Sequence, residues 1–389
     1  MVYLDHHATT PVDARVLEAM LPYFSEKFGN ASSKQHRFGW DASDAVERAR
    51  KQIAQLIGAS SKEIVFTSGA TEANNLAVKG IARAAEGTGS LGLTRDHIVT
   101  IVTEHRAVLD PVASLAKGGW RTTVLPVKGD GLIDLAELEA AITDRTALVS
   151  VMAANNEIGV LQPIKEAAAA AHAKGAWFHT DAVQAIGKVP FDVAALDVDV
   201  ASITAHKIYG PKGVGALFVR KGLKLAAQID GGGQERGMRS GTLNVPGIVG
   251  FGRAAEIGRA EMPSESARVA KLRDRLLERL TANLRDRRHM EVTVNGATHA
   301  RLPGNLNVSF AGVDGEALLV SLDDIAVSSG AACTKAEPSH VLMALGLAKD
   351  RALASLRFGI GRGTTEADVD YAAAKVADVV TRLREMSPA

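Results

Sequence analysis

The stretch Ile64-Val65-Phe66-Thr67-Ser68-Gly69-Ala70-Thr71-Glu72 decides how this chain folds. Its first three residues are β-branched or aromatic and predict a buried strand. The small residues from Ser68 to Thr71 predict a turn, and a helical stretch through Leu76 and Val78 follows. A strand, a short turn and a helix are together the repeating unit of an α/β sheet.

The same unit recurs from about residue 60 to residue 220. Beyond 64–66, apolar runs predict strands at 97–102, 122–126, 147–152, 176–178, 200–203 and 214–219. Helical stretches such as 135–142 and 164–173 lie between them. Fully apolar strands that alternate with helices are typical of a sheet covered on both faces. We therefore predict an α/β fold with a mostly parallel seven-stranded sheet.

The pattern changes after Gly247. A long amphipathic helix is predicted over 267–290 from apolar residues three or four positions apart, namely Val269, Leu272, Leu276, Leu280 and Leu284. A strand is predicted at 306–310. We expect two domains: a large one over 15–260, and a smaller α/β C-terminal one built from 1–14 and 261–389.

Composition narrows the class of protein. The 389 residues contain 45 Lys and Arg against 44 Asp and Glu, so no basic excess indicates direct binding to nucleic acid. We find neither a secretory signal pattern nor an apolar run long enough to span a membrane. The single cysteine, Cys333, excludes an internal disulfide, and the adjacent His6 and His7 do not suffice for a metal site. We expect a cytoplasmic, enzyme-sized protein without membrane contact or bound metal.

Three sites along the predicted sheet carry candidate chemistry. The turn at Ala70 and Thr71 begins a helix and suits a phosphate, although many such turns only cap helices. Asp181 follows a predicted strand, where ligands bind in this architecture, or it caps a helix. Lys207 also follows a predicted strand and is either a Schiff-base lysine or an ordinary surface lysine.

Taken together, the three sites match the needs of pyridoxal 5'-phosphate. Lys207 would bind the cofactor covalently as an aldimine, and the Asp181 carboxylate would keep the pyridine nitrogen protonated. Thr204, His206 and the Ala70-Thr71 turn would hold the phosphate. Cys333 lies among small and polar residues, which indicates an exposed loop and a reactive thiol. A lone cysteine is also often a buried apolar residue, and its spacing does not decide between the two.

Long motifs in this sequence resemble those of the NifS/IscS-type cysteine desulfurases, in the class V aminotransferase family. The resemblance runs from Tyr3 to about Arg384. Its motifs are Tyr3-Leu4-Asp5, Ala8-Thr9-Thr10-Pro11, Phe66-Thr67-Ser68-Gly69-Ala70-Thr71-Glu72, Thr103-Glu104-His105, Asn155-Asn156-Glu157-Ile158-Gly159, His206-Lys207-Ile208-Tyr209-Gly210-Pro211-Lys212-Gly213, Arg236-Gly237-Met238-Arg239-Ser240-Gly241-Thr242 and Ser328-Ser329-Gly330 with Cys333.

The resemblance implies a fold-type I pyridoxal-phosphate transferase that works as a homodimer. It assigns catalysis to Cys333, Lys207 and His105, with His105 stacked on the cofactor ring as an acid or base. The cofactor-binding residues that it implies are Ala70, Thr71, His105, Asn155, Asp181, Gln184, Thr204, His206, Lys207 and, from the other subunit, Thr242. Asn155 and Arg357 would hold the substrate carboxylate, a role that suits the planar guanidinium.

By the same resemblance, the protein would convert L-cysteine to L-alanine and keep the sulfur as a persulfide on Cys333. An acceptor protein would then take the sulfur, either an iron–sulfur scaffold or a protein of tRNA or DNA sulfuration. Only Lys335 and Ala336 separate Cys-Thr from Glu-Pro here, two residues fewer than is usual in this branch. The alternatives are a selenocysteine lyase or another β-eliminating lyase, and a non-catalytic partner protein with this fold.

Overall fold

The computed structural model describes residues 1–85, 95–285, 292–329 and 337–386. Its centre is a seven-stranded sheet in the order β2-β8-β7-β6-β5-β3-β4, with neighbouring strands parallel except where β8 pairs with β2 and β7. The strands are β2 (Ile64–Thr67), β3 (His97–Ile101), β4 (Arg121–Leu125), β5 (Thr146–Ser150), β6 (Trp177–Asp181), β7 (Val200–Thr204) and β8 (Gly215–Val219). The mostly parallel seven-stranded sheet predicted from the sequence is confirmed.

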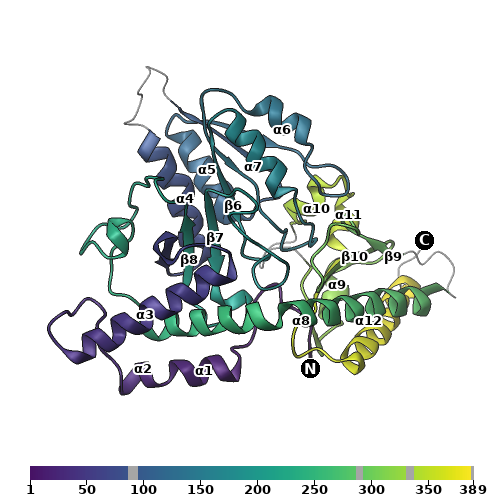
Figure 1. The fold of residues 1–389 in the computed structure, drawn as a ribbon. Coiled ribbons are helices and arrows are strands. Elements are labelled where there is room, and N and C mark those ends of the chain that lie inside the picture. The colour runs from purple at the N-terminus through teal and green to yellow at the C-terminus, as the bar shows by residue number, and fades with distance from the viewer. Residues whose placement is uncertain (86–94, 286–291, 330–336, 387–389) are drawn as a thin grey trace.

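Helices cover both faces of this sheet (Figure 1). They are α3 (Arg37–Leu56), α4 (Ala70–Ala85), α5 (Arg106–Lys117), α6 (Leu135–Ala141) and α7 (Ile164–Ala173), with α1 (Ala14–Met20) and α2 (Pro22–Ser25) further out. Every residue of β2, β3, β5, β7 and β8 is buried, whereas β4 lies at an edge and is partly exposed. The continuous apolar runs in the sequence reflect this burial on both faces.

A second group of elements surrounds two smaller sheets. The strands β12-β10-β9 are antiparallel, and β1 pairs in parallel with β11. The bounds are β1 (Val2–Tyr3), β9 (Val292–Val294), β10 (Asn305–Phe310), β11 (Ile325–Ala326), β12 (Ser355–Gly359), α9 (Gly315–Val320), α10 (His340–Ala344), α11 (Lys349–Leu353) and α12 (Glu366–Met386). Because β1 joins this group, the two ends of the chain share one core that includes Leu4 and Val380.

Helix α8 (Val245–Arg285) runs along both parts of the molecule (Figure 1). It is longer than the helix predicted over 267–290, because Ile248, Phe251 and Ala255 already pack as a helical face on the core of the large sheet. All five apolar residues that defined the prediction are buried in the second core. Helix α8 thus crosses the expected boundary at residue 260, and the division into two domains stays a prediction.

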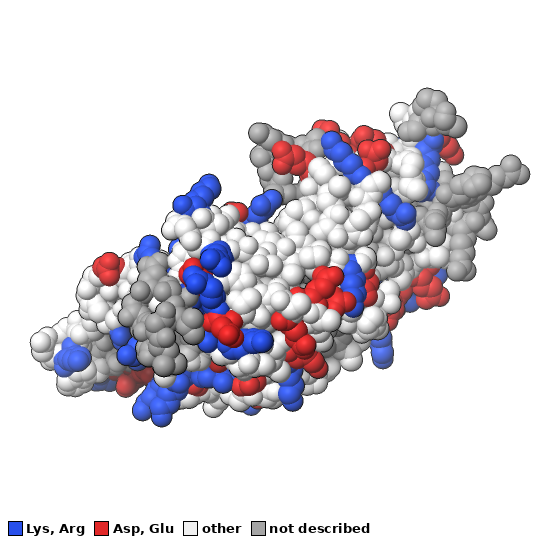
Figure 2. All heavy atoms as spheres, turned by 90° about the horizontal axis from the view of Figure 1, so that it is seen from above, with Lys and Arg blue, Asp and Glu red and all other residues white. Residues whose placement is uncertain are grey.

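Acidic and basic side chains are interspersed over the face of the molecule drawn in Figure 2. Some of these opposite charges form ion pairs between neighbouring helices. Arg275 of α8, for example, contacts Asp370 of α12 at 2.6 Å. Within the described residues, every helix is either too short or too polar to cross a membrane.

Candidate active site

The carboxyl ends of the parallel strands border a cavity of about 530 Å³. The turn after β2, the residue before α5, the segments after β6 and β7, and Ala8 and Thr9 of the N-terminal segment all line it. Ligands of open α/β sheets bind outside the carboxyl ends of the strands, and this volume suits a small molecule. The cavity is therefore the candidate active site.

Lys207 reaches this cavity from a single 3₁₀ turn, η2 (Ala205–Lys207), directly after β7. Its Nζ donates hydrogen bonds to the carbonyl oxygens of His7 at 2.6 Å and Ala8 at 2.5 Å. Burial, followed by the positive charge of Arg357, lowers the pKa of Lys207 to about 8. A lysine with this pKa is partly neutral near pH 7, and only the neutral amine is a nucleophile.

Asp181 is the last residue of β6 and is buried. Its Oδ2 accepts a hydrogen bond from Asn74 Nδ2 at 2.8 Å, and its Oδ1 accepts one from the backbone N–H of Val183 at 3.0 Å. Both donors are neutral, so the carboxylate keeps its negative charge available to a cation in the cavity. Position and chemistry therefore suit a partner for a protonated ring nitrogen.

The phosphate-binding turn predicted at Ala70 and Thr71 borders the same cavity. Helix α4 begins at Ala70, so the N–H groups of its first turn and the positive end of its dipole are located here. Lys207 and Lys212 add positive charge beside them. The turn lies close against β8, because a Cβ on Gly215 would come within 2.8 Å of Gly69 Cα.

Thr204 and His206 also line this end of the cavity. Thr204 Oγ1 donates to the Val214 carbonyl at 3.1 Å, and His206 Nδ1 lies 3.1 Å from Thr9 Oγ1. Burial, and then the charges of Lys207 and Lys212, lower the pKa of His206 to about 4. The ring is therefore neutral near pH 7 and can offer one N–H to an anion.

His105 is exposed and lines the cavity at the start of α5. Its Nδ1 caps the helix by accepting the N–H of Ala107 at 3.0 Å. A neutral imidazole has one N–H, so this bond places the proton on Nε2.

Gln184 lines the cavity from the segment after β6, and its Nε2 donates to the His7 carbonyl at 3.0 Å. The sequence did not place His7 in this site. Five polar residues that line the cavity were not assigned from the sequence: Thr9, Ser68, Glu72, Asn156 and Lys212. Each belongs to a motif that carries the family resemblance. Membership of such a motif was the only sign in the sequence that these residues have a role in the site.

Three predicted site residues do not line this cavity. The side chain of Asn155 bonds backbone atoms, with Nδ2 donating to the Thr103 carbonyl at 2.9 Å. Arg357 of β12 contacts Asp5 Oδ1 through Nη2 at 2.6 Å. Thr242 is exposed on the segment after η3 (Glu235–Gly237). Their roles stay predictions.

Cys333 lies outside the described residues, so its predicted role is not tested. The segment that precedes it begins beside Arg357, because the backbones of Ser328 and Arg357 form an isolated antiparallel bridge. Ser328 Oγ also donates to Asp5 Oδ2 at 3.0 Å. The described part of the chain therefore leads toward Cys333 from the neighbourhood of Arg357.

The site combines a mostly parallel sheet, a lysine and an aspartate at neighbouring strand ends, and a helix N-terminus flanked by lysines. This combination is typical of an α/β enzyme of the pyridoxal-phosphate type. Residues 2–372 match the aminotransferase class-V family. The chain is 57% identical over 391 residues to "Cysteine desulfurase IscS" of Anaeromyxobacter sp. (strain Fw109-5), with 100% of this chain and 94% of that protein covered.

Solved structures show the same relationship. A NifS-like protein superposes with a TM-score of 0.90 at 39% identity, covering 98% of this chain and 100% of the other. A structure described as SspA in complex with cysteine has a TM-score of 0.81 at 36% identity, covering 93% and 99%. The chain therefore belongs to the aminotransferase class-V family.

Within that family, the protein is a cysteine desulfurase of the NifS/IscS type, and pyridoxal phosphate is its cofactor. The residues present fit this cofactor. The cavity is large enough, its lysine is partly neutral, its strand-end carboxylate is free of ion pairs among the described residues, and its helix N-terminus is flanked by lysines. Within the described ranges, no group of three or more metal-ligating side chains was found.

Proposed function

We propose that this enzyme converts L-cysteine to L-alanine and passes the sulfur, carried as a persulfide on Cys333, to an acceptor protein. The observation that carries the proposal is the partly neutral Lys207 in one cavity with Asp181 and Gln184. A structural relative described as a complex with cysteine supports the choice of substrate.

Lys207 Nζ would hold the cofactor covalently. Asp181 would pair with the ring nitrogen and Gln184 with the ring hydroxyl, while Thr71, Thr204 and His206, with the first turn of α4, would hold the phosphate. When bound, pyridoxal phosphate supplies an electron sink for the pair left behind when the α-proton of the substrate is removed.

Lys207 and His105 would move the protons of the reaction. Lys207 would accept the α-proton of the substrate, since a pKa of about 8 leaves part of this amine neutral near pH 7. Because Nδ1 of His105 caps α5, Nε2 is the ring nitrogen left to exchange a proton with the substrate.

Arg357 and Asn155 would bind the substrate carboxylate, with Asn155 next to the cofactor as well. Arg357 is buried, and its Nε lacks a hydrogen-bond partner among the described residues. A substrate carboxylate would complete the hydrogen bonding of that guanidinium, in competition with Asp5.

The transfer to Cys333 balances without an external oxidant. The Cys333 thiolate attacks the sulfur of the substrate, the Cβ–S bond breaks, and its electron pair with a proton gives the methyl group of alanine. The new S–S bond leaves a persulfide. Because the sequence contains one cysteine, no second thiol can relay the sulfur within the chain.

We also propose a homodimer in which Thr242 reaches the phosphate site of the other subunit. Thr242 is exposed and does not line the cavity of its own chain. Large apolar side chains are exposed on α1, α2, the start of α3 and the segments between them, which a second copy would cover. They are Leu17, Leu21, Phe24, Phe28, Phe38 and Trp40.

The acceptor would be an iron–sulfur scaffold or a protein of tRNA or DNA sulfuration. The relatives named IscS favour the first of these. Trapping of the persulfide-loaded enzyme with each candidate acceptor would identify the pathway.

One assay tests the activity. The purified protein is expected to show the visible absorbance of bound pyridoxal phosphate and, with cysteine and a thiol reductant, to release alanine and sulfide. Cys333→Ser should abolish sulfide release and keep the absorbance, whereas Lys207→Ala should lose both. Full sulfide release by Cys333→Ser would indicate simple β-elimination instead, and a colourless wild type would refute the cofactor assignment.

A further inference from the structure

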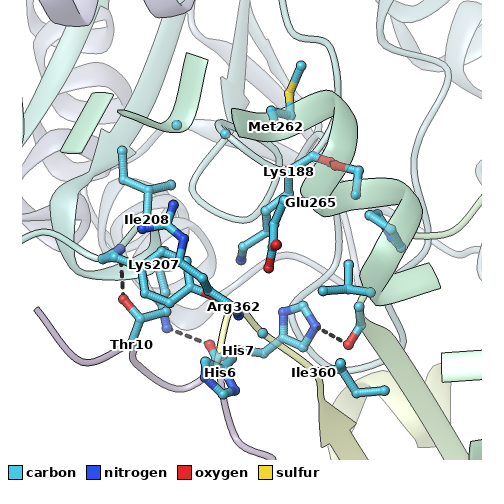
Figure 3. A pocket seen from close by; sticks show the side chains of 18 residues that line it. His6, His7, Thr10, Lys188, Lys207, Ile208, Met262, Glu265, Ile360 and Arg362 are labelled. Carbon is cyan, nitrogen blue, oxygen red and sulfur yellow. Dashed lines mark hydrogen bonds between the residues drawn. The ribbon is translucent and has the colours of Figure 1, made fainter. Parts of the chain in front are cut away.

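A second cavity, which we call the back cavity, lies beside Lys207 (Figure 3). Met262 and Glu265 of α8 line it on one side and His6 on another. Its volume is about 50 Å³, enough for a few water molecules and too small for a substrate. Lys207 lines both this cavity and the candidate active site, so the back cavity borders the reacting residue.

Lys188 projects into this back cavity and is partly buried. Its Nζ donates a hydrogen bond to Gln184 Oε1 at 2.8 Å. Burial lowers its pKa to about 7, and the charges that act most strongly on it, Lys207 and Arg357, are both positive. A cation held among other cations is costly, and such an arrangement calls for an explanation.

The explanation lies in the side chain that Lys188 contacts. Gln184 Oε1 accepts hydrogen bonds from Lys188 Nζ and from His7 Nδ1, at 2.8 and 2.9 Å, while Gln184 Nε2 donates to the His7 carbonyl at 3.0 Å. These contacts fix the orientation of the amide, because a flipped amide would place an NH₂ group against the ammonium. The second N–H of Nε2 remains available as a donor, and Gln184 also lines the candidate active site.

We propose that Lys188 is a positioning residue for the cofactor: through the Gln184 amide, its charge strengthens the hydrogen bond that Gln184 donates to the ring hydroxyl of pyridoxal phosphate. This inference rests on the proposed function, which places that ring beside Gln184. A cation bound to an amide oxygen polarises the amide and makes its N–H a stronger donor. While Lys188 is protonated, which its pKa of about 7 limits to neutral and lower pH, its positive charge also disfavours a proton on the linked Lys207 nitrogen.

The test is the pH titration of the visible absorbance of the holoenzyme. Lys188→Met removes the charge and keeps the length, whereas Lys188→Gln keeps a donor without the charge. Both should shift the midpoint of the titration upward by about one pH unit, since loss of a nearby cation favours the protonated form. Both should also weaken binding of pyridoxal phosphate to the apoprotein, measured by fluorescence, by about tenfold.

Lys188→Arg, which keeps the charge, should retain the wild-type midpoint, and Lys165→Met on the exposed face of α7 is the matched control. The other charged or titratable groups around the back cavity are His6, His7, Tyr209, Glu265 and Arg362, and all of them stay in place in these variants. A coloured Lys188→Gln or Lys188→Met protein with the wild-type midpoint overturns this inference alone. A colourless wild type overturns the proposed function.

Discussion

Replacement of Glu235 by alanine should destabilise the protein more than almost any other single charge deletion. Glu235 begins η3, and its carboxylate accepts from Arg50 Nη1 at 2.7 Å, from Arg50 Nη2 at 2.8 Å and from the backbone N–H of Phe66 at 2.7 Å. The side chains of Arg50 and Glu235 are 5% and 2% exposed. One buried carboxylate thus joins η3, α3 and β2.

The expected loss follows from what the truncation leaves behind. Removing one partner of a buried ion pair costs about 3–5 kcal/mol when the other charge is left without compensation. The low end applies here, because Arg50 Nε keeps its contact with Glu47 Oε1 at 2.9 Å. The N–H of Phe66 also loses its acceptor, which costs about 1–3 kcal/mol when it occurs alone. These costs overlap, so we expect a loss of about 3 kcal/mol, a large part of the stability of an ordinary protein.

Urea unfolding of the holoenzyme, followed by circular dichroism, measures the effect. The matched control is Glu256→Ala, because the Arg253–Glu256 pair on α8 is 39% and 43% exposed and should contribute about 0–1 kcal/mol. Glu235→Gln, which keeps an acceptor for Phe66, should lose less than Glu235→Ala. A Glu235→Ala protein as stable as the Glu256→Ala control would refute the reasoning.

Three further predictions concern residues in or next to the large sheet. Gly215→Ala should weaken cofactor binding and cost about 1–3 kcal/mol of stability, because its Cβ would meet Gly69 at 2.8 Å, whereas Gly363→Ala has open space and should be neutral; equal effects would contradict this. Uptake of pyridoxal phosphate by the apoprotein should rise about tenfold per pH unit up to about pH 8, the pKa of Lys207, and then level off; a flat profile would contradict the proposed role of that amine. Burial lowers the pKa of His179 from 6.5 to about 3, so its contribution to stability is complete above about pH 6.5 and is lost as the pH falls toward 3. The pH slope of stability in that range should be shallower in His179→Asn by up to about 1.4 kcal/mol per unit, and an unchanged slope would disprove it.

Much of the fold was predictable because its signals are local. All seven strands of the large sheet were predicted with ends within three residues of those observed, since buried strands show as short apolar runs. The positions of Asp181 and Lys207 followed from the same runs, because both residues come at strand ends. The start of α8 was missed, because its first turns are rich in glycine and small residues and gain their helical character from packing.

The sequence by itself determined which residue types stand at the ends of which strands, because the hydrophobic periodicity of strands and helices is visible in the order of neighbouring residues. Only the tertiary structure decided which distant side chains meet. The contacts of His7 with Gln184, of Arg357 with Asp5 and of Arg50 with Glu235 join positions 177, 352 and 185 residues apart. Such contacts depend on how whole layers pack, and no local pattern records them.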